Sequence, residues 1–95
     1  MRVEWDPEKD EINQRKLGIS FREAAEVFHD PLHIAILDRR FSYFEERWIV
    51  LGRTHVQQTL VVAALWYFDE KGEEIIRIIS AREATAHERR QYEEL

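Results

Sequence analysis

Two arginines near the end of this chain have the type and spacing to bind a phosphate group. Arg77 interrupts an apolar run that extends from Ile75 to Ile79, and Arg82 follows five positions later. A guanidinium keeps its charge, and its burial without a partner is costly. Arg77 must therefore pair with a carboxylate or bind an anion. If both project to the same side, their planar forks would suit a phosphodiester, because each fork can bind two phosphate oxygens.

A second charged group consists of Glu45, Glu46 and Arg47, at the start of an expected strand. Strand alternation puts Glu45 and Arg47 on one face and Glu46 on the other. Either carboxylate could neutralise Arg77 or act as a general base toward a ribose hydroxyl, and Arg47 could stabilise a developing negative charge. An acidic pair at a strand start also protects a sheet edge from pairing with other chains. The pattern leaves both interpretations open.

The arginines near the C-terminus also have a purely structural interpretation. Arg77 could pair with a carboxylate across the sheet. The charges of the last helix could form a solvated face with pairs such as Glu83 with His87 or Arg90. The residues alone do not separate this interpretation from a phosphate site.

Composition excludes several kinds of site. The chain has no cysteine, which excludes a disulfide scaffold, thiol catalysis and a thiolate metal site. Its 4 histidines lack the spacing of zinc ligands, and its 3 glycines are isolated, so no glycine-rich phosphate loop is present. We therefore expect no metal site and no nucleotide-triphosphate chemistry.

Length and charge limit the class of protein. With 95 residues, the chain is expected to form one domain over 1–95. The net charge of -5 argues against nonspecific nucleic-acid binding and favours a basic protein partner. The longest uncharged apolar stretch, 60–68, is too short to cross a bilayer, and the start of the chain does not resemble a signal peptide. We expect a cytoplasmic protein without a membrane partner.

The first third of the chain is predicted to be mostly helical. The pattern indicates a short strand at 3–5 and then a helix over 7–17, whose core candidates are Ile12 and Leu17. A capping box that begins at Ser20 predicts a second short helix.

The rest of the chain is predicted to be mainly extended. Four segments favour strands, at 32–37, 48–51, 60–68 and 75–79. A second capping box at Ser80 predicts a final helix. The resulting order, β-α-α-β-β-β-β-α, predicts an α+β fold with a mainly antiparallel sheet, two N-terminal helices and one C-terminal helix.

The whole pattern resembles the BrnT family of type II toxins, which are small ribonucleases with a RelE-like fold. The order and spacing of many short pieces carry the resemblance, and no single motif does. These pieces are Trp5-Asp6, Lys9, Asn13, residues 16–21, Glu23-Ala24, residues 27–30, residues 45–47, Gly52, residues 76–82, Ala84, Glu88-Arg89 and Tyr92.

This resemblance implies a metal-independent endoribonuclease that needs no cofactor, inhibits translation and arrests growth. It also implies a BrnA-like antitoxin, a ribbon-helix-helix DNA binder encoded beside the toxin. The pair would repress its own operon and would contact operator DNA only through the antitoxin. A higher-order complex would form through the antitoxin dimer.

The resemblance also implies roles for individual residues. Arg77 and Arg82 would hold the scissile phosphate of the RNA and stabilise the transition state, with Glu45, Glu46 and Arg47 close by. Further RNA contacts are expected from Lys16, Arg89 and Tyr92. RelE-like enzymes generally use the ribose 2′-hydroxyl as an internal nucleophile, so the protein need supply only positioning, charge stabilisation and proton transfer.

Leu17 departs from the family pattern, because members often have histidine at this position. This departure predicts a reduced or differently organised activity. The alternative function is therefore a catalytically weak binding module that acts as a co-repressor with a DNA-binding antitoxin.

Overall fold

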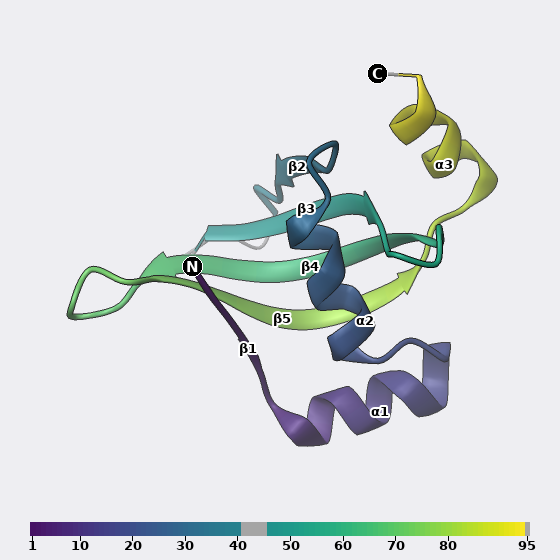
Figure 1. Cartoon of the computed structure of the whole chain (residues 1–95). Helices are drawn as coiled ribbons and strands as arrows, with labels where there is room; N and C mark the ends of the chain where they lie inside the picture. Colours follow the sequence, from purple (N-terminus) through teal and green to yellow (C-terminus); the bar gives the residue numbers. More distant parts are fainter. Residues whose placement is uncertain (41–45, 95) are drawn as a thin grey trace.

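A five-stranded sheet forms the centre of the structure, a computed structural model that describes residues 1–40 and 46–94. The sheet has the spatial order β1-β5-β4-β3-β2, and β1 runs parallel to β5 while the other neighbours are antiparallel (Figure 1). The predicted α+β fold with a mainly antiparallel sheet is thus confirmed. The strands are β1 (Arg2–Trp5), β2 (Ile34–Leu37), β3 (Glu46–Arg53), β4 (Thr59–Phe68) and β5 (Glu74–Glu83).

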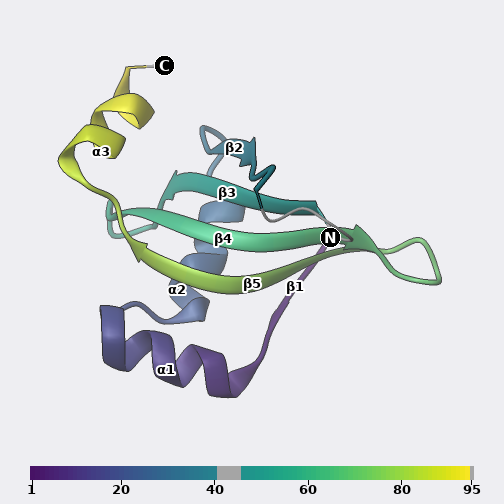
Figure 2. The ribbon, with the colours of Figure 1, turned by 180° about the vertical axis from the view of Figure 1, so that it is seen from behind.

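Two helices pack against the sheet, the first beside the edge of β5 and the second on one face. They are α1 (Pro7–Leu17) and α2 (Phe21–Ala25), and a 3-10 turn, η1 (Glu26–His29), continues α2. Asp6 caps α1 by accepting a hydrogen bond from the Glu8 amide, and Ser20 forms the predicted capping box at α2. The third helix, α3 (Ala86–Glu93), lies at the other end of the chain and contacts the opposite face (Figure 2).

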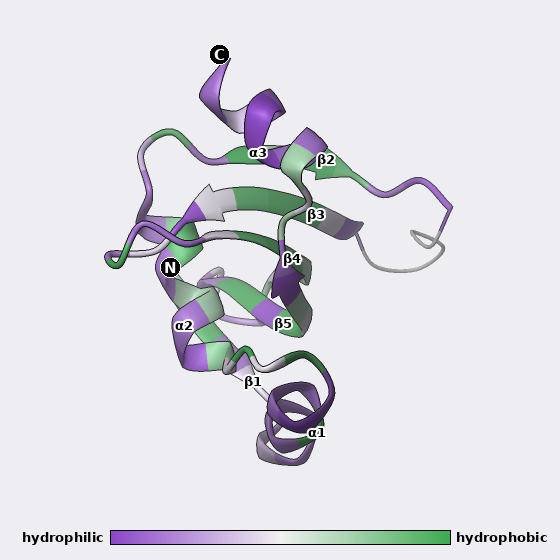
Figure 3. Ribbon diagram, turned by 90° about the vertical axis from the view of Figure 1, so that its right-hand side faces the viewer, coloured by the Kyte–Doolittle hydropathy of each residue, from purple (hydrophilic) through white to green (hydrophobic). Residues whose placement is uncertain are grey.

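The main core lies between the sheet and α2. Phe21 from α2, Leu60 and Val62 from β4, and Ile76 from β5 are completely buried. Each such large aliphatic or aromatic side chain stabilises the fold by about 1.5–3 kcal/mol. Figure 3 shows the apolar residues concentrated in the strands, whereas α1 and α3 are mostly polar. The sheet and α2 therefore supply most of the apolar burial.

The helix α1 is held to the sheet by a polar side chain. The predicted core candidates Ile12 and Leu17 are 40% and 50% exposed, so that prediction was wrong. Asn13 is buried instead, and its amide donates to the Ala81 carbonyl at 2.8 Å and accepts from the Ala81 amide at 3.2 Å. Because β1 pairs with β5 only as far as Ile78, the Asn13 amide satisfies strand groups that β1 does not reach.

The end of β5 differs from the prediction. The Ser80 capping box was expected to begin a helix, but residues 80–83 continue the strand and pair with 60–63 of β4. The final helix begins later, after a capping box between Thr85 and Glu88. Arg82 therefore lies on a strand, and the prediction that it shares a helix with Arg89 was wrong. Pairing with β4 outweighs the local capping signal.

Candidate functional site

The sheet face opposite α2 carries four arginines of the strands, and we term it the open face. Figure 2 views the sheet from this side, with α2 behind it. Alternation and the strand register place these side chains on it: Ile34 and Ile36 of β2, Arg47, Ile49, Leu51 and Arg53 of β3, Val61, Ala63, Leu65 and Tyr67 of β4, and Arg77, Ser80 and Arg82 of β5.

A β-bulge brings Arg77 and Arg82 to the same face. The two residues are five positions apart, so strict alternation would direct them to opposite faces. The register shifts after Ala63, which pairs with Ser80, and this shift leaves Ile79 as an extra residue in β5. Both arginines consequently lie on the open face, as a phosphate clamp would require.

Arg47 and Arg77 flank Leu65 in one row across the open face. Leu65 is paired with both of them, and because neighbouring strands are about 4.8 Å apart, the two arginine Cα atoms lie roughly 10 Å apart. A carboxylate lies at each outer end. Asp38 Oδ2 is 3.9 Å from Arg47 Nε, and Glu4 Oε1 is 3.2 Å from Arg77 Nη1. These five residues form what we term the arginine row.

Glu4 is the carboxylate that neutralises Arg77. It lies directly beside Arg77 in the parallel pairing of β1 with β5, and its Oε1 also accepts a hydrogen bond from the Tyr67 hydroxyl at 2.9 Å. The Arg77 side chain is 39% exposed, so one side of its guanidinium faces water. A carboxylate across the sheet was one of the predicted partners, although the sequence pointed to Glu45 or Glu46.

The guanidinium group of Arg82 is hydrogen-bonded to a carboxylate of the protein itself. Its two terminal nitrogens donate to the two oxygens of Glu88 at 2.8 and 2.9 Å. These hydrogen bonds lower the pKa of Glu88 to about 2 and raise the pKa of Arg82. A phosphate that binds this fork must displace a carboxylate. The pair also ties α3 to the end of β5.

Tyr92 fastens α3 at a second point. Its ring packs on Leu51 and Val61, and its hydroxyl donates to Asp30 Oδ2 at 2.5 Å. Burial, together with this bond to a carboxylate, raises the pKa of Tyr92. The Arg53 guanidinium lies over the ring, 4.8 Å from its centroid. The Tyr92 hydroxyl is thus engaged inside the protein.

The other predicted residues that the structure describes lie away from the arginine row. Glu46 pairs with Trp66 and projects to the face that α2 covers, and Glu45 lies outside the described residues. Lys16 is exposed on α1, beside a hollow that also includes Ser80 at the edge of β5. Arg89 is exposed on α3 and donates to the Ala84 carbonyl at 3.3 Å. Of the eight predicted site residues, the row contains only Arg47 and Arg77.

Sequence reasoning missed three polar members of this neighbourhood. Glu4, Asp38 and Tyr67 all contact or adjoin the arginines. Only the strand register could have identified Glu4, because 73 positions separate it from Arg77. No local pattern contains that information.

Two kinds of feature are not found in the part of the chain that the structure describes. No helix in 1–40 and 46–94 is long and apolar enough to cross a membrane. Over the same residues, no three histidine or carboxylate side chains form a group that could hold a metal ion.

Comparisons with known proteins agree with this architecture. Residues 5–88 match the family described as the ribonuclease toxin, BrnT, of type II toxin-antitoxin systems. The crystal structure of the Brucella abortus ribonuclease toxin, BrnT, is similar in fold, with a TM-score of 0.66 and 20% sequence identity. The similarity covers 90% of this chain and 97% of that one. No curated protein matches the chain. Because the family match extends over most of its length, this chain belongs to the BrnT family of ribonuclease toxins of type II toxin-antitoxin systems.

Proposed function

We propose that the chain is a metal-independent endoribonuclease that cleaves RNA on the open face, and that it thereby inhibits translation and arrests growth. The arginine row is the observation that carries this proposal. Two guanidinium groups flank a single leucine, and each has a carboxylate on its outer side. Such an arrangement suits one phosphate bound between two cations.

Phosphate binding follows from the chemistry of the row. A phosphodiester above Leu65 is within reach of both Arg47 and Arg77, and charge-assisted hydrogen bonds from arginine to phosphate are among the strong ones. The hydrogen bond to Glu4 orients the Arg77 guanidinium before RNA arrives, and Asp38 lies 3.9 Å from Arg47 Nε. Donors that are already oriented stabilise the extra negative charge of a transition state more effectively than donors that must first reorganise.

Glu4 is the proton acceptor in this proposal. It lies beside Arg77 and receives the Tyr67 hydroxyl hydrogen bond, so its carboxylate is held at one end of the row. Glu4 takes the proton of the ribose 2′-hydroxyl while the oxygen forms a bond to phosphorus. The bond from phosphorus to the 5′-oxygen breaks, and this leaving oxygen takes a proton from water. The products are a 2′,3′-cyclic phosphate and a 5′-hydroxyl.

The proposal gives the other residues different roles. Arg82 and Tyr92 act as positioning residues, because both hold α3 through carboxylates. Lys16 and Arg89 are exposed cations that could contact the backbone of a longer RNA. Neither Glu45 nor Glu46 has a role in the proposed cleavage step.

The test of the proposal is RNA cleavage by the purified protein in the presence of EDTA. Arg77→Ala should lower the cleavage rate by about a hundredfold or more, because a donor to the transition state is lost. Arg22→Ala is the matched control, since Arg22 is an exposed arginine on α2, and this variant should cleave RNA like the wild type. Thermal unfolding of both variants checks the fold. If the wild type leaves RNA intact and its expression alone is harmless to cells, the proposal is wrong.

We also propose that the antitoxin implied by the family is a BrnA-like ribbon-helix-helix protein that neutralises the toxin. The complex would bind operator DNA through the antitoxin, repress the operon and assemble further through the antitoxin dimer. The acidic net charge of -5 supports a basic protein partner. Gel-shift assays with operator DNA should show binding by the pair and no binding by this chain alone.

A second candidate function is that of a catalytically weak co-repressor. Leu17 favours this weaker activity, because the family often has histidine at that position and leucine cannot transfer a proton. This leucine lines a hollow that also includes Ser80 of β5. The carboxylates bound to Arg77 and Arg82 also favour this function, since both arginines then have a structural role. Operator binding by the pair, together with no RNA cleavage by the wild-type chain, would identify this function.

A further inference from the structure

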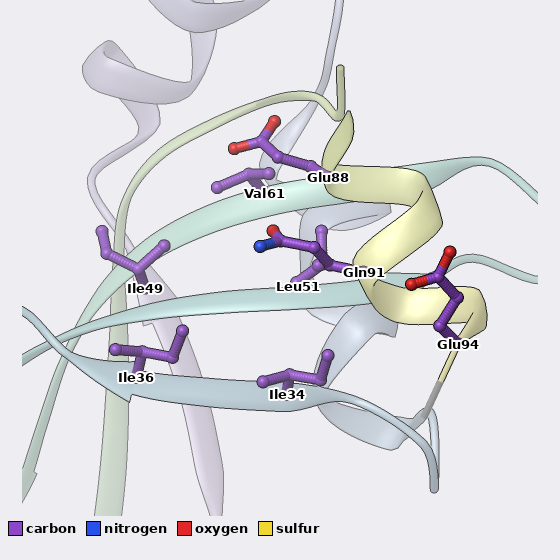
Figure 4. A pocket seen from close by; sticks show the side chains of 8 residues that line it. All are labelled: Ile34, Ile36, Ile49, Leu51, Val61, Glu88, Gln91 and Glu94. Carbon is purple, nitrogen blue, oxygen red and sulfur yellow. The ribbon is translucent and has the colours of Figure 1, made fainter. Parts of the chain in front are cut away.

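An apolar groove of about 450 Å³ lies on the open face beside α3 (Figure 4). Three neighbouring strands form its floor, and one side of α3 forms its wall. The floor residues are Ile34, Ile36, Ile49, Leu51 and Val61, and the wall residues are Glu88, Gln91 and Glu94. Figure 4 shows the Gln91 amide directed from the helix toward the strands.

The floor of the groove leaves several isoleucine side chains exposed to solvent. Ile36 is 62% exposed even though it projects from a strand, and it borders the partly exposed Ile34 and Ile49. Its strand, β2, is the outermost strand of the sheet. A contiguous exposed apolar surface with a polar rim is typical of a protein interaction site.

The charge of the groove indicates what can occupy it. Two of its three wall residues are glutamates, and no lysine or arginine is among its described lining residues. Glu88 is engaged by Arg82, whereas within residues 1–40 and 46–94 Glu94 has no ion pair. This wall repels the phosphates of RNA and attracts cationic side chains.

We propose that this groove is the docking site of the antitoxin, and that its occupant is an amphipathic segment with lysine or arginine beside its apolar face. Aliphatic side chains of the segment fill the floor between Ile34 and Val61, and its cations lie along Glu94. This mode of recognition, in which an apolar helix face enters a groove, is common among peptide-binding proteins. The inference rests on the antitoxin partner and not on the proposed cleavage chemistry.

The position of the groove also provides a mechanism of inhibition. Ile49 follows Arg47 by two residues on the same face, a separation of about 6.8 Å along the strand. Val61, at the other side of the floor, is paired with Arg82. A segment seated in the groove therefore lies against the arginine row and excludes RNA from it.

Two pairs of lysine substitutions test the proposal at matched net charge. Ile36→Lys and Glu94→Lys alter the groove, and their respective controls are Val56→Lys and Glu70→Lys, both at exposed positions outside it. Lysine is common on edge strands, so Ile36→Lys should retain the fold, and thermal unfolding checks this. The first probe is a labelled amphipathic peptide of leucine and lysine, and the second is a version with glutamate in place of lysine.

We expect the leucine-lysine peptide to bind the wild type and both controls, and each groove variant to bind it at least about tenfold more weakly. The peptide with glutamate should not bind. Equal binding by the groove variants and their controls would overturn the proposal. The same holds if labelled oligouridylate binds and the groove variants weaken that binding, because the groove would then be an RNA subsite.

The antitoxin from the neighbouring reading frame provides the decisive assay. Both groove variants should form the complex at least about tenfold more weakly than their controls, while their own RNA cleavage stays unchanged. Unaltered complex formation would overturn the docking proposal. If the wild type binds the antitoxin through the groove but cleaves no RNA, the docking proposal holds and the proposed nuclease function fails.

Discussion

Glu4 connects three side chains of the open face. Its carboxylate accepts hydrogen bonds from Tyr67 and Arg77, and Arg2 lies 4.0 Å away. The half-buried Arg77 therefore keeps its charge at modest cost, because a partner is fixed beside it. The same contacts hold Glu4 where it could take a proton from a bound ribose.

Replacing Glu4 with glutamine tests this second role. The amide keeps an oxygen that can accept the Tyr67 hydrogen bond but cannot act as a base. Glu4→Gln should lower the RNA cleavage rate by about a hundredfold or more. Glu73→Gln, which alters another carboxylate that contacts Arg2, is the control and should leave the rate unchanged. A normal rate for Glu4→Gln would assign Glu4 a structural role only.

At the scale of single residues, the sequence predicted which face of the sheet a side chain occupies better than it predicted its ion-pair partner. Alternation correctly separated Arg47 from Glu46, because that rule depends only on the strand itself. The partner of Arg77 could not be derived in this way. Glu4 reaches it only because β1 adds to the sheet edge in parallel, and this pairing depends on the whole sheet.

At the scale of elements, α3 depends on ion pairs and hydrogen bonds for its position. It has 8 residues and is mostly polar, and isolated helices of this length are unstable in water. Three contacts tie it to the strands and to η1. They are Arg82 with Glu88, Arg53 with Glu93, and Tyr92 with Asp30 at the end of η1.

The Glu88 contact predicts an acid-dependent loss of stability. Hydrogen bonds from Arg82 lower the pKa of Glu88 from 4.5 to about 2, so the folded state binds this proton less readily than the unfolded state. The contribution of Glu88 is therefore complete above about pH 4.5 and is lost as the pH falls toward 2. Urea unfolding across this range should show a smaller decline for Glu88→Gln than for the wild type. Equal declines would mean that other carboxylates dominate the acid response.

Elements with strong local signals were predicted well. The capping box at Ser20 begins the second helix as expected, because side chain and backbone partner are within a few residues. The signal at Ser80 failed for the opposite reason. Residues 80–83 have a partner in β4, and that distant strand decides their conformation.

At the scale of the molecule, the charges are distributed unevenly. The chain carries a net charge of -5, yet Arg47, Arg77 and Arg82 lie on one face. RNA should therefore bind through few phosphate contacts, while the rest of the surface repels it. An acidic surface with a small cationic site favours selective binding over coating of the RNA.

This distribution of charge predicts that the affinity for RNA depends only weakly on salt concentration. Each phosphate contact on single-stranded RNA changes the slope of log affinity against log salt by about -0.7, so two arginine contacts predict a slope of about -1.4. Arg77→Ala should reduce the steepness by about 0.7, and Arg22→Ala should leave it unchanged. Anisotropy measurements with a non-cleavable 2′-deoxy oligonucleotide can determine these slopes. A much steeper wild-type slope would indicate that RNA contacts extend far beyond the arginine row.

The bulge at Ile79 allows β5 to carry two arginines five positions apart on one face. If Arg77 and Arg82 kept this spacing and the strand followed strict alternation, Arg82 would turn toward the face that α2 covers, away from Glu88. The helix α3 would lose an anchor, and the groove beside it would lose the helix that forms its wall. The irregular pairing at position 79 therefore holds Arg82 where it can fix α3.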